Sequence, residues 1–430
     1  TDMDEKQQNR LQLLQFIKES FTYSLTKIIP GILGFFSVII FLRLLGPEEY
    51  GLYSMLFLLV QISSFFCFGW FRQALLRYYS RLSSNTDLSS IMSSALLITI
   101  SLNILFLAVF YFVQFPIPFP FVSIILLAIS ISLFALSAII YMAQEKPAKV
   151  VQLTVLQSIL AIALPFAFIH FVSPTHIQLI NGLVLAYGIT ALIFLYQQLR
   201  HHQPVLHWVW PRFASLKQLQ PLLQFGWPLS FWYAGSTGLR FLDRFFIEHY
   251  LDSAVMGSYA GFTEMITRFF TVLLFPVTLA LHPRIMNLWN EKKYSNAIHL
   301  LKTGLITQSG LFLIVLLIYV VFKDQWLLLL FAVFPDLDSA LINIIIPIMF
   351  GGFLWQFALL VHKPLEVREK SKLMLIFIFL SIAVNIIGNM VFLPKVGVIA
   401  TAYTMVVSGG VYLLFTMLAS SRFWMVRFGK

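Results

Sequence analysis

The chain has 430 residues, of which 59% are hydrophobic and 11% are charged. A soluble domain carries about a quarter charged residues, because its surface faces water. With a mean hydropathy of +0.85, the composition excludes an ordinary soluble enzyme. The formal net charge of +11 does not indicate a nucleic-acid partner, because basic residues collect in the cytoplasmic loops of membrane proteins.

The apolar residues form blocks long enough to cross hydrocarbon, without the short alternating segments of a barrel. They predict an all-α integral membrane protein with about twelve transmembrane helices, because a helix satisfies its own backbone groups in lipid. The expected spans are residues 21–44, 51–78, 89–113, 119–143, 150–172, 177–198, 222–250, 254–283, 297–322, 339–361, 372–393 and 396–419. Residues 326–334 are too short to span and are expected at the membrane interface.

The longest polar break, 199–221, falls midway along the chain and predicts a cytoplasmic linker between two six-helix bundles, 21–198 and 222–419. An amphipathic segment, 1–20, is expected to precede them and a cytoplasmic tail, 420–430, to follow. An internal repeat supports the division, since Leu45, Gly51 and Tyr53 match Leu251, Gly257 and Tyr259 at an offset of 206. An even number of spans per half predicts parallel pseudo-repeats around a central cavity.

Lysine and arginine predict the orientation. When the N-terminus is placed inside, most of the 29 basic residues fall in inner segments, and the outer turns keep Arg43, Lys323 and Lys395. The positive-inside rule therefore puts both termini in the cytoplasm.

The sequence carries no phosphate-binding Walker loop, dinucleotide glycine fingerprint, His-Glu-x-x-His or Cys-x-x-Cys motif. We therefore expect a transporter rather than an enzyme, with no cofactor and no metal site. One enzyme class stays open, an integral-membrane glycan polymerase or ligase, although such enzymes usually have a long outer loop and every outer break here is short.

Ionisable side chains at membrane depth are costly and usually functional, and they cluster on three predicted helices. These residues are Lys27 on the first, Arg240, Asp243 and Arg244 on the seventh, and Glu264 and Arg268 on the eighth. Helical spacing places Arg240, Asp243 and Arg244 on one side, and leaves an Arg240–Glu264 or Asp243–Arg268 bridge open. The four cations outnumber the two acids, which suits an anionic headgroup, since guanidinium binds phosphate in a bidentate way.

Two further interpretations stay open at this point. Asp243 and Glu264 either form ion pairs between helices or carry H⁺ or Na⁺ in an exchange cycle, with the membrane potential as another driving force. Arg72 and Arg77 at the inner end of the second helix are either positive-inside anchors or part of a cavity mouth.

Several stretches resemble the polysaccharide-biosynthesis flippases of the Wzx type. They are Phe41-Leu-Arg-Leu-Leu-Gly-Pro-Glu-Glu-Tyr-Gly-Leu-Tyr-Ser54, Leu222-Leu-Gln-Phe-Gly-Trp-Pro-Leu229, Asp243-Arg-Phe-Phe-Ile247 and Gly257-Ser-Tyr259. Asp243 and Arg244 stand in the family's Asp-Arg pair. The Gly-Pro turn of the first half is replaced in the second half by Asp252-Ser-Ala-Val-Met-Gly257, and this departure leaves the conformation of that turn open.

The resemblance implies a member of the multidrug/oligosaccharidyl-lipid/polysaccharide exporter superfamily in the bacterial cytoplasmic membrane. The implied activity is alternating-access transfer of an undecaprenyl-diphosphate-linked oligosaccharide from the inner to the outer leaflet. Its expected partners are this lipid-linked substrate, membrane lipids, and polymerases and other glycan-assembly proteins. The alternative of the same fold is a cation-coupled multidrug antiporter.

Overall fold

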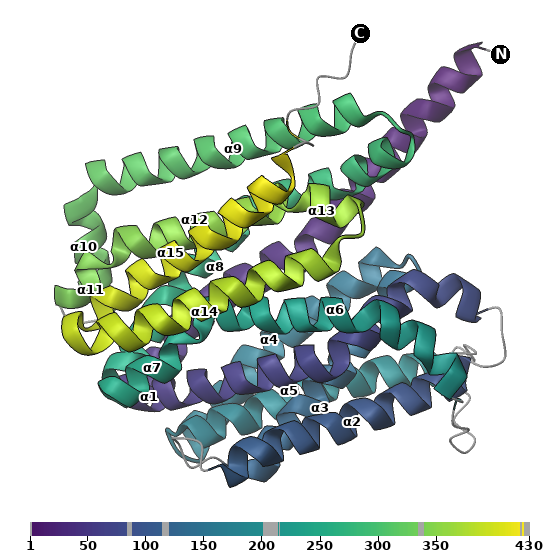
Figure 1. Cartoon of the computed structure of the whole chain (residues 1–430). Coiled ribbons are helices and arrows are strands. Elements are labelled where there is room, and N and C mark those ends of the chain that lie inside the picture. The colour runs from purple at the N-terminus through teal and green to yellow at the C-terminus, as the bar shows by residue number, and fades with distance from the viewer. Residues whose placement is uncertain are drawn as a thin grey trace.

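The computed structural model consists of long helices arranged in two groups (Figure 1). It describes the backbone of residues 2–83, 88–113, 120–200, 214, 216–333, 339–421 and 424, and most side chains from residue 25 onward within these ranges. Every regular element in these ranges is a helix. The predicted all-α class is therefore confirmed for the described part of the chain.

The N-terminal lobe contains α1 (Asp2–Ser83), α2 (Leu88–Phe112), α3 (Phe121–Ala143), α4 (Pro147–Phe171) and α5 (His176–Arg200). α1 holds two predicted spans, because the chain turns at Gly46, whose φ of 78° suits a residue without Cβ. Pro47 follows at the start of the next helical segment, where its missing N–H is not needed. We call residues 2–45 the first segment of α1 and residues 47–83 its second segment.

The C-terminal lobe contains the remaining helices. They are α6 (Leu216–Phe241), α7 (Asp243–Tyr250), α8 (Ser253–Asn290), α9 (Tyr294–Val321), α10 (Lys323–Val333), α11 (Ser339–Asn343), α12 (Ile345–Val361), α13 (Lys363–Val367), α14 (Ser371–Val396) and α15 (Val398–Ala419). With 11 residues, α10 is too short to span, as predicted for 326–334.

The number of spans agrees with the sequence. Ten helices among the described residues are long and apolar enough to cross a membrane. The first of these, Leu25–Tyr79, counts twice because of the turn at Gly46. The consecutive helices α6 and α7 add one more, so ten plus one plus one gives the predicted twelve.

α6 passes from one lobe to the other. Near its start, Leu219 and Leu222 pack into the apolar cluster of the N-terminal lobe around Trp70. Further along, Trp232 and Leu239 pack into a cluster of the C-terminal lobe.

The predicted linker 199–221 is shorter than expected, because α5 continues to Arg200 and α6 begins at Leu216. Residues 201–213 lie outside the described residues.

The beginning of α1 and the end of α15 lie at the same end of the molecule (Figure 1). We call this end the terminal side, and the end that holds the Gly46 turn the opposite side. An even number of spans requires this arrangement. The assignment of the terminal side to the cytoplasm stays a prediction.

The internal repeat has a structural explanation on the opposite side. A Cβ on Gly257 would collide with the Pro47 carbonyl oxygen and lie 2.9 Å from the Gly51 nitrogen, and a Cβ on Gly51 would lie 2.6 Å from the Ser253 carbonyl oxygen. The two repeat glycines therefore let the lobes touch backbone to backbone. The turn before α8 differs from the Gly46 turn, since Asp252 has an extended backbone and accepts a hydrogen bond from the Val255 amide at 2.7 Å.

Candidate functional site

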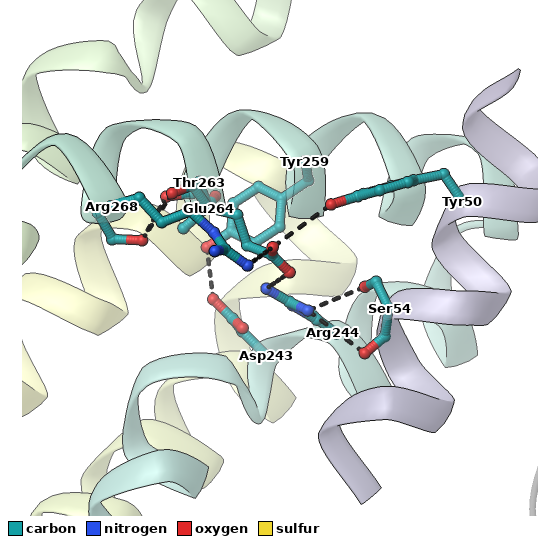
Figure 2. A network of polar contacts seen from close by, with 9 residues as sticks. Tyr50, Ser54, Asp243, Arg244, Tyr259, Thr263, Glu264 and Arg268 are labelled. Carbon is teal, nitrogen blue, oxygen red and sulfur yellow. Dashed lines mark hydrogen bonds and ion pairs between the residues drawn. The ribbon is translucent and has the colours of Figure 1, made fainter. Parts of the chain in front are cut away.

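Glu264 of α8 is the centre of a buried polar network (Figure 2). Its Oε1 lies 2.9 Å from Nη2 of Arg244, and its Oε2 lies 3.3 Å from Nη2 of Arg268. Glu264 is 8% exposed and Arg244 is 3% exposed. One carboxylate therefore serves two guanidinium groups, and the three side chains together carry a net charge of +1.

The network joins the two lobes through the second segment of α1. Arg244 donates from Nη1 to the Ser54 hydroxyl at 2.9 Å and to the Ser54 carbonyl at 3.4 Å. The Tyr50 hydroxyl donates to Oε2 of Glu264 at 3.4 Å. Figure 2 shows Tyr50 and Ser54 reaching toward α7 and α8 from the neighbouring helix. Separation of the lobes at this point would break these hydrogen bonds.

Asp243 lies beside this network but has a different partner. The Tyr259 hydroxyl donates to Oδ2 of Asp243, while Oδ1 is buried without a hydrogen bond among the described residues. Tyr259 occupies the position in the second half that Tyr53 occupies in the first. The partner of Asp243 is therefore a residue of the internal repeat. The proposed Asp243–Arg268 bridge is absent from the described contacts.

Arg268 is the most exposed member of the network. Its side chain is 35% exposed, against 4% for that of Arg244. Its guanidinium lies against the first segment of α1, because a Cβ on Gly34 would collide with it. Lys27 is seven residues before Gly34, hence on the same face of α1 and about 10 Å further toward the terminal side.

Lys27 is exposed, and among the described residues no carboxylate lies within ion-pair distance of it. Arg72 is close enough for its charge to act on Lys27. The Arg72 guanidinium lies 5.9 Å from the ring centre of Phe65 and 5.7 Å from that of Tyr233 on α6. Arg268, Lys27 and Arg72 thus follow one another between the lobes, and we call these three residues the cationic track.

Arg240 does not join the Glu264 network, so the Arg240–Glu264 bridge is not formed. Its Nε donates to the Ser236 carbonyl at 3.3 Å, and its guanidinium lies 5.3 Å from the Trp355 ring centre. The side chain borders a small pocket within the C-terminal lobe, lined also by Leu239, Gly351, Leu354, Trp355, Ala358, Met405 and Gly409. No carboxylate pairs with it in the part of the chain that the structure describes.

Arg240 and Arg244 remain neighbours across the break between α6 and α7. Their guanidinium carbons lie 5.1 and 4.6 Å from the centre of the same ring, that of Phe241. At Leu242 the Phe245 amide bonds to the Leu242 carbonyl at 3.2 Å, three residues back instead of four, as in a tight turn. Arg240 borders the pocket of the C-terminal lobe, whereas Arg244 of α7 reaches Glu264 of α8 and Ser54 of α1.

Arg77 lies at the terminal side of the second segment of α1. Its guanidinium is 4.5 Å from the Phe225 ring centre, and its Nη2 is 3.7 Å from Oε1 of Glu369. Both charged side chains are well exposed, at 46% and 77%. Arg77 therefore forms a loose pair between the lobes rather than part of a buried site.

A second cluster of ionisable residues was not found from the sequence. Nζ of Lys363 bonds to Nδ1 of His282 at 2.8 Å and to the Glu366 carboxylate. Nδ1 of His362 is 3.1 Å from the Tyr412 hydroxyl. The sequence signal is weak, because the residues come from α8, α13 and α15 and are far apart in the chain. A single lysine at a helix end is also what the positive-inside rule predicts for any membrane helix.

The described residues contain no group of three or more His, Cys, Asp or Glu side chains arranged to hold a metal ion. The charged side chains of the site act through electrostatic attraction. Two arginines share one acid, and two further cations lie toward the terminal side. Such a surface favours an anion with several oxygens, since charge-assisted hydrogen bonds to phosphate are among the stronger polar contacts.

The sequence matches two family models. One, described as polysaccharide biosynthesis protein, matches residues 16–289, and another, described as MatE, matches residues 228–391. No curated protein matches the sequence significantly.

Solved membrane transporters share the fold. An inward-facing multidrug resistance MATE family transporter of the MOP superfamily is 15% identical, with a TM-score of 0.65 over 94% of this chain and 96% of that one. An outward-facing conformation of such a transporter is 16% identical, with a TM-score of 0.63 over 94% of both chains. A MOP superfamily transporter from Pyrococcus furiosus, described by a binding pocket of reverse polarity, is 15% identical, with a TM-score of 0.62 over 96% of both chains.

Proposed function

Since the chain belongs to the polysaccharide biosynthesis protein family, we propose that it transfers a polyprenyl-diphosphate-linked oligosaccharide across the membrane by alternating access. The observation that carries the proposal is the cationic track of Arg268, Lys27 and Arg72. Glu264 is already shared with Arg244, so it neutralises Arg268 incompletely. The track thus keeps excess positive charge between the lobes.

A diphosphate matches this charge pattern. Its oxygens would bind the charged heads of Lys27 and Arg268, while the glycan would pass between the lobes and the polyprenyl tail would stay in lipid. Arg240 is a less favourable contact for the diphosphate, because its guanidinium lies over the rings of Phe241 and Trp355 within one lobe. Arg244 acts as a structural cation, since Ser54 and Glu264 occupy it.

A transport measurement tests the proposal. Purified protein in liposomes receives a polyprenyl-diphosphate oligosaccharide, and a lectin outside the vesicle reports the glycan that has crossed. Lys27→Ala and Arg72→Ala should each lower the rate at subsaturating substrate by about tenfold, because a charge-assisted hydrogen bond is worth about 1.5–3 kcal/mol. Unchanged rates in both variants would overturn the proposal.

The matched control is Lys395→Ala. Lys395 is exposed at the opposite side, near the turn between α14 and α15. Its replacement by alanine removes one positive charge at a place far from the track. Its rate should equal that of the unaltered protein. An equal loss in all three variants would assign the effect to net charge rather than to the track.

Multidrug transport is the second candidate, favoured by the MatE match over residues 228–391 and by the multidrug transporters among the structural neighbours. The cationic track argues against it, because cationic drugs would be repelled there. A panel of cationic drugs offered to the same vesicles separates the two candidates. Export of these drugs without glycan transfer would establish the second.

A further inference from the structure

Arg268 has two roles in the geometry, since it ends the cationic track and also binds the carboxylate that joins the lobes. Its Nη1 lies against Gly34 of the first segment of α1, and its Nη2 contacts Oε2 of Glu264. The same Oε2 accepts the hydrogen bond from Tyr50 of the other lobe. Arg268 and Tyr50 therefore share one acceptor oxygen.

We propose that Arg268 is an anion receptor that controls the contact between the lobes through Glu264. The inference rests on the proposed function and specifies how the anionic end of the substrate would act on this site. When an anion draws the Arg268 guanidinium toward Lys27, Oε2 of Glu264 loses a cationic partner. The Tyr50 hydroxyl then becomes its main donor, and Glu264 keeps one cation, Arg244, in place of two.

The direction of the effect follows from the charges. A carboxylate shared by two guanidinium groups binds each of them less strongly than it binds one alone. Removal of Arg268 from the pair therefore strengthens the Glu264–Arg244 ion pair and the Tyr50–Glu264 hydrogen bond, which is long at 3.4 Å. Arg244 in turn holds Ser54 of the N-terminal lobe. A bound anion thus stabilises the closed contact on the opposite side.

Thermodynamic linkage makes this coupling reciprocal. If the anion tightens the contact between Tyr50 and Glu264, the loss of that contact must weaken anion binding, although Tyr50 does not touch the anion. An Arg268 that merely attracted the anion would show no dependence on Tyr50. The two possibilities therefore differ in one measurable quantity, the affinity for a diphosphate.

The experiment measures binding of farnesyl diphosphate and of inorganic diphosphate to the full-length protein by calorimetry. Arg268→Ala should weaken binding by about tenfold or more, and Tyr50→Phe by about fivefold. Tyr53→Phe is the matched control, because Tyr53 lies three residues further along the same helix and forms no hydrogen bond with Glu264 among the described contacts. Its affinity should match that of the unaltered protein.

Spin labels report the conformation directly. Glu48 and Ala254 are exposed on the two lobes at the opposite side, and the native Cys67 is buried, so Glu48→Cys with Ala254→Cys gives a label pair. Farnesyl diphosphate should increase the population with the short distance, and Arg268→Ala should abolish that response.

Three outcomes overturn the inference. Equal affinities of Tyr50→Phe and Tyr53→Phe, or a label distance that ignores the diphosphate, would remove the coupling while leaving the proposed function in place. Failure of the unaltered protein to bind either diphosphate would instead remove both.

Discussion

The Glu264 network and the Lys363 cluster use similar charges for different purposes. Glu264 lies between two arginines and joins α8 to α1 of the other lobe. Glu366 lies beside Lys363, and the partners around it, His282 and His362, belong to the same lobe. Its side chain is 35% exposed, whereas that of Glu264 is 11% exposed.

The difference teaches which charges can adapt. A buried lysine can release its proton, but a guanidinium stays charged in proteins. If the Lys363 cluster loses its acid, Lys363 can therefore become neutral. The histidines of the cluster can also change their protonation state. Arg244 and Arg268 of the Glu264 network keep their charge, so loss of the acid would leave both without compensation.

The same substitution at both acids is the strongest test of this comparison. Glu264→Gln leaves Arg244 buried without an opposing charge and should lower the free energy of unfolding by about 3–5 kcal/mol. Glu366→Gln should lower it by about 1–2 kcal/mol, because Lys363 keeps His282 as a partner and the Glu366 side chain is itself 35% exposed. Thermal unfolding in detergent measures both, and equal losses would contradict the distinction.

A glycine substitution tests the backbone contact next to the network. Gly257→Ala should destabilise the closed contact by about 1–3 kcal/mol, because its methyl group would collide with the Pro47 carbonyl. The control is Gly310→Ala, since nothing lies within 4 Å of a Cβ at Gly310. The label pair described above should show a longer distance in Gly257→Ala and no change in Gly310→Ala; identical distances in the two variants would be the contrary result.

The smallest effect is expected at the terminal side. Arg77→Ala should change the free energy of unfolding by less than about 1 kcal/mol, because its pair with Glu369 is exposed and 3.7 Å long. Unfolding in detergent measures it, with Lys395→Ala as the reference for loss of one exposed charge. A loss as large as that of Glu264→Gln would mean that both ends of the lobe contact are equally fixed.

The transmembrane spans were predictable because hydropathy is averaged over about 20 residues, so single residues do not change the result. Apolar blocks and short breaks place twelve spans, and Gly46 with Pro47 marks the turn that divides α1. The ends of the linker were less predictable, since Leu216–Pro221 is helical despite its proline. Pro221 is the sixth residue of α6, beyond the first turn where a missing N–H costs nothing, so the helix runs through a proline that would ordinarily mark its boundary.

The site was predictable in composition but not in pairing. Depth and charge identify Arg244, Glu264 and Arg268, and the structure brings them together. Helical spacing correctly places Arg240 near Arg244, since both lie over the Phe241 ring, but it does not reveal that Arg240 stays outside the Glu264 network. The tyrosine and serine partners also carry no charge to reveal them, so Tyr50 and Ser54 emerge from the three-dimensional arrangement alone.

The meeting of Gly51 and Gly257 has a consequence for the origin of the chain. The two residues occupy equivalent positions in the two halves, and they touch each other rather than unrelated surfaces. In a symmetric homodimer of a single ancestral half, such a residue would contact its own copy across the two-fold axis. A glycine at that point would then have served both subunits at once, and gene fusion would have preserved the contact as two separate codons.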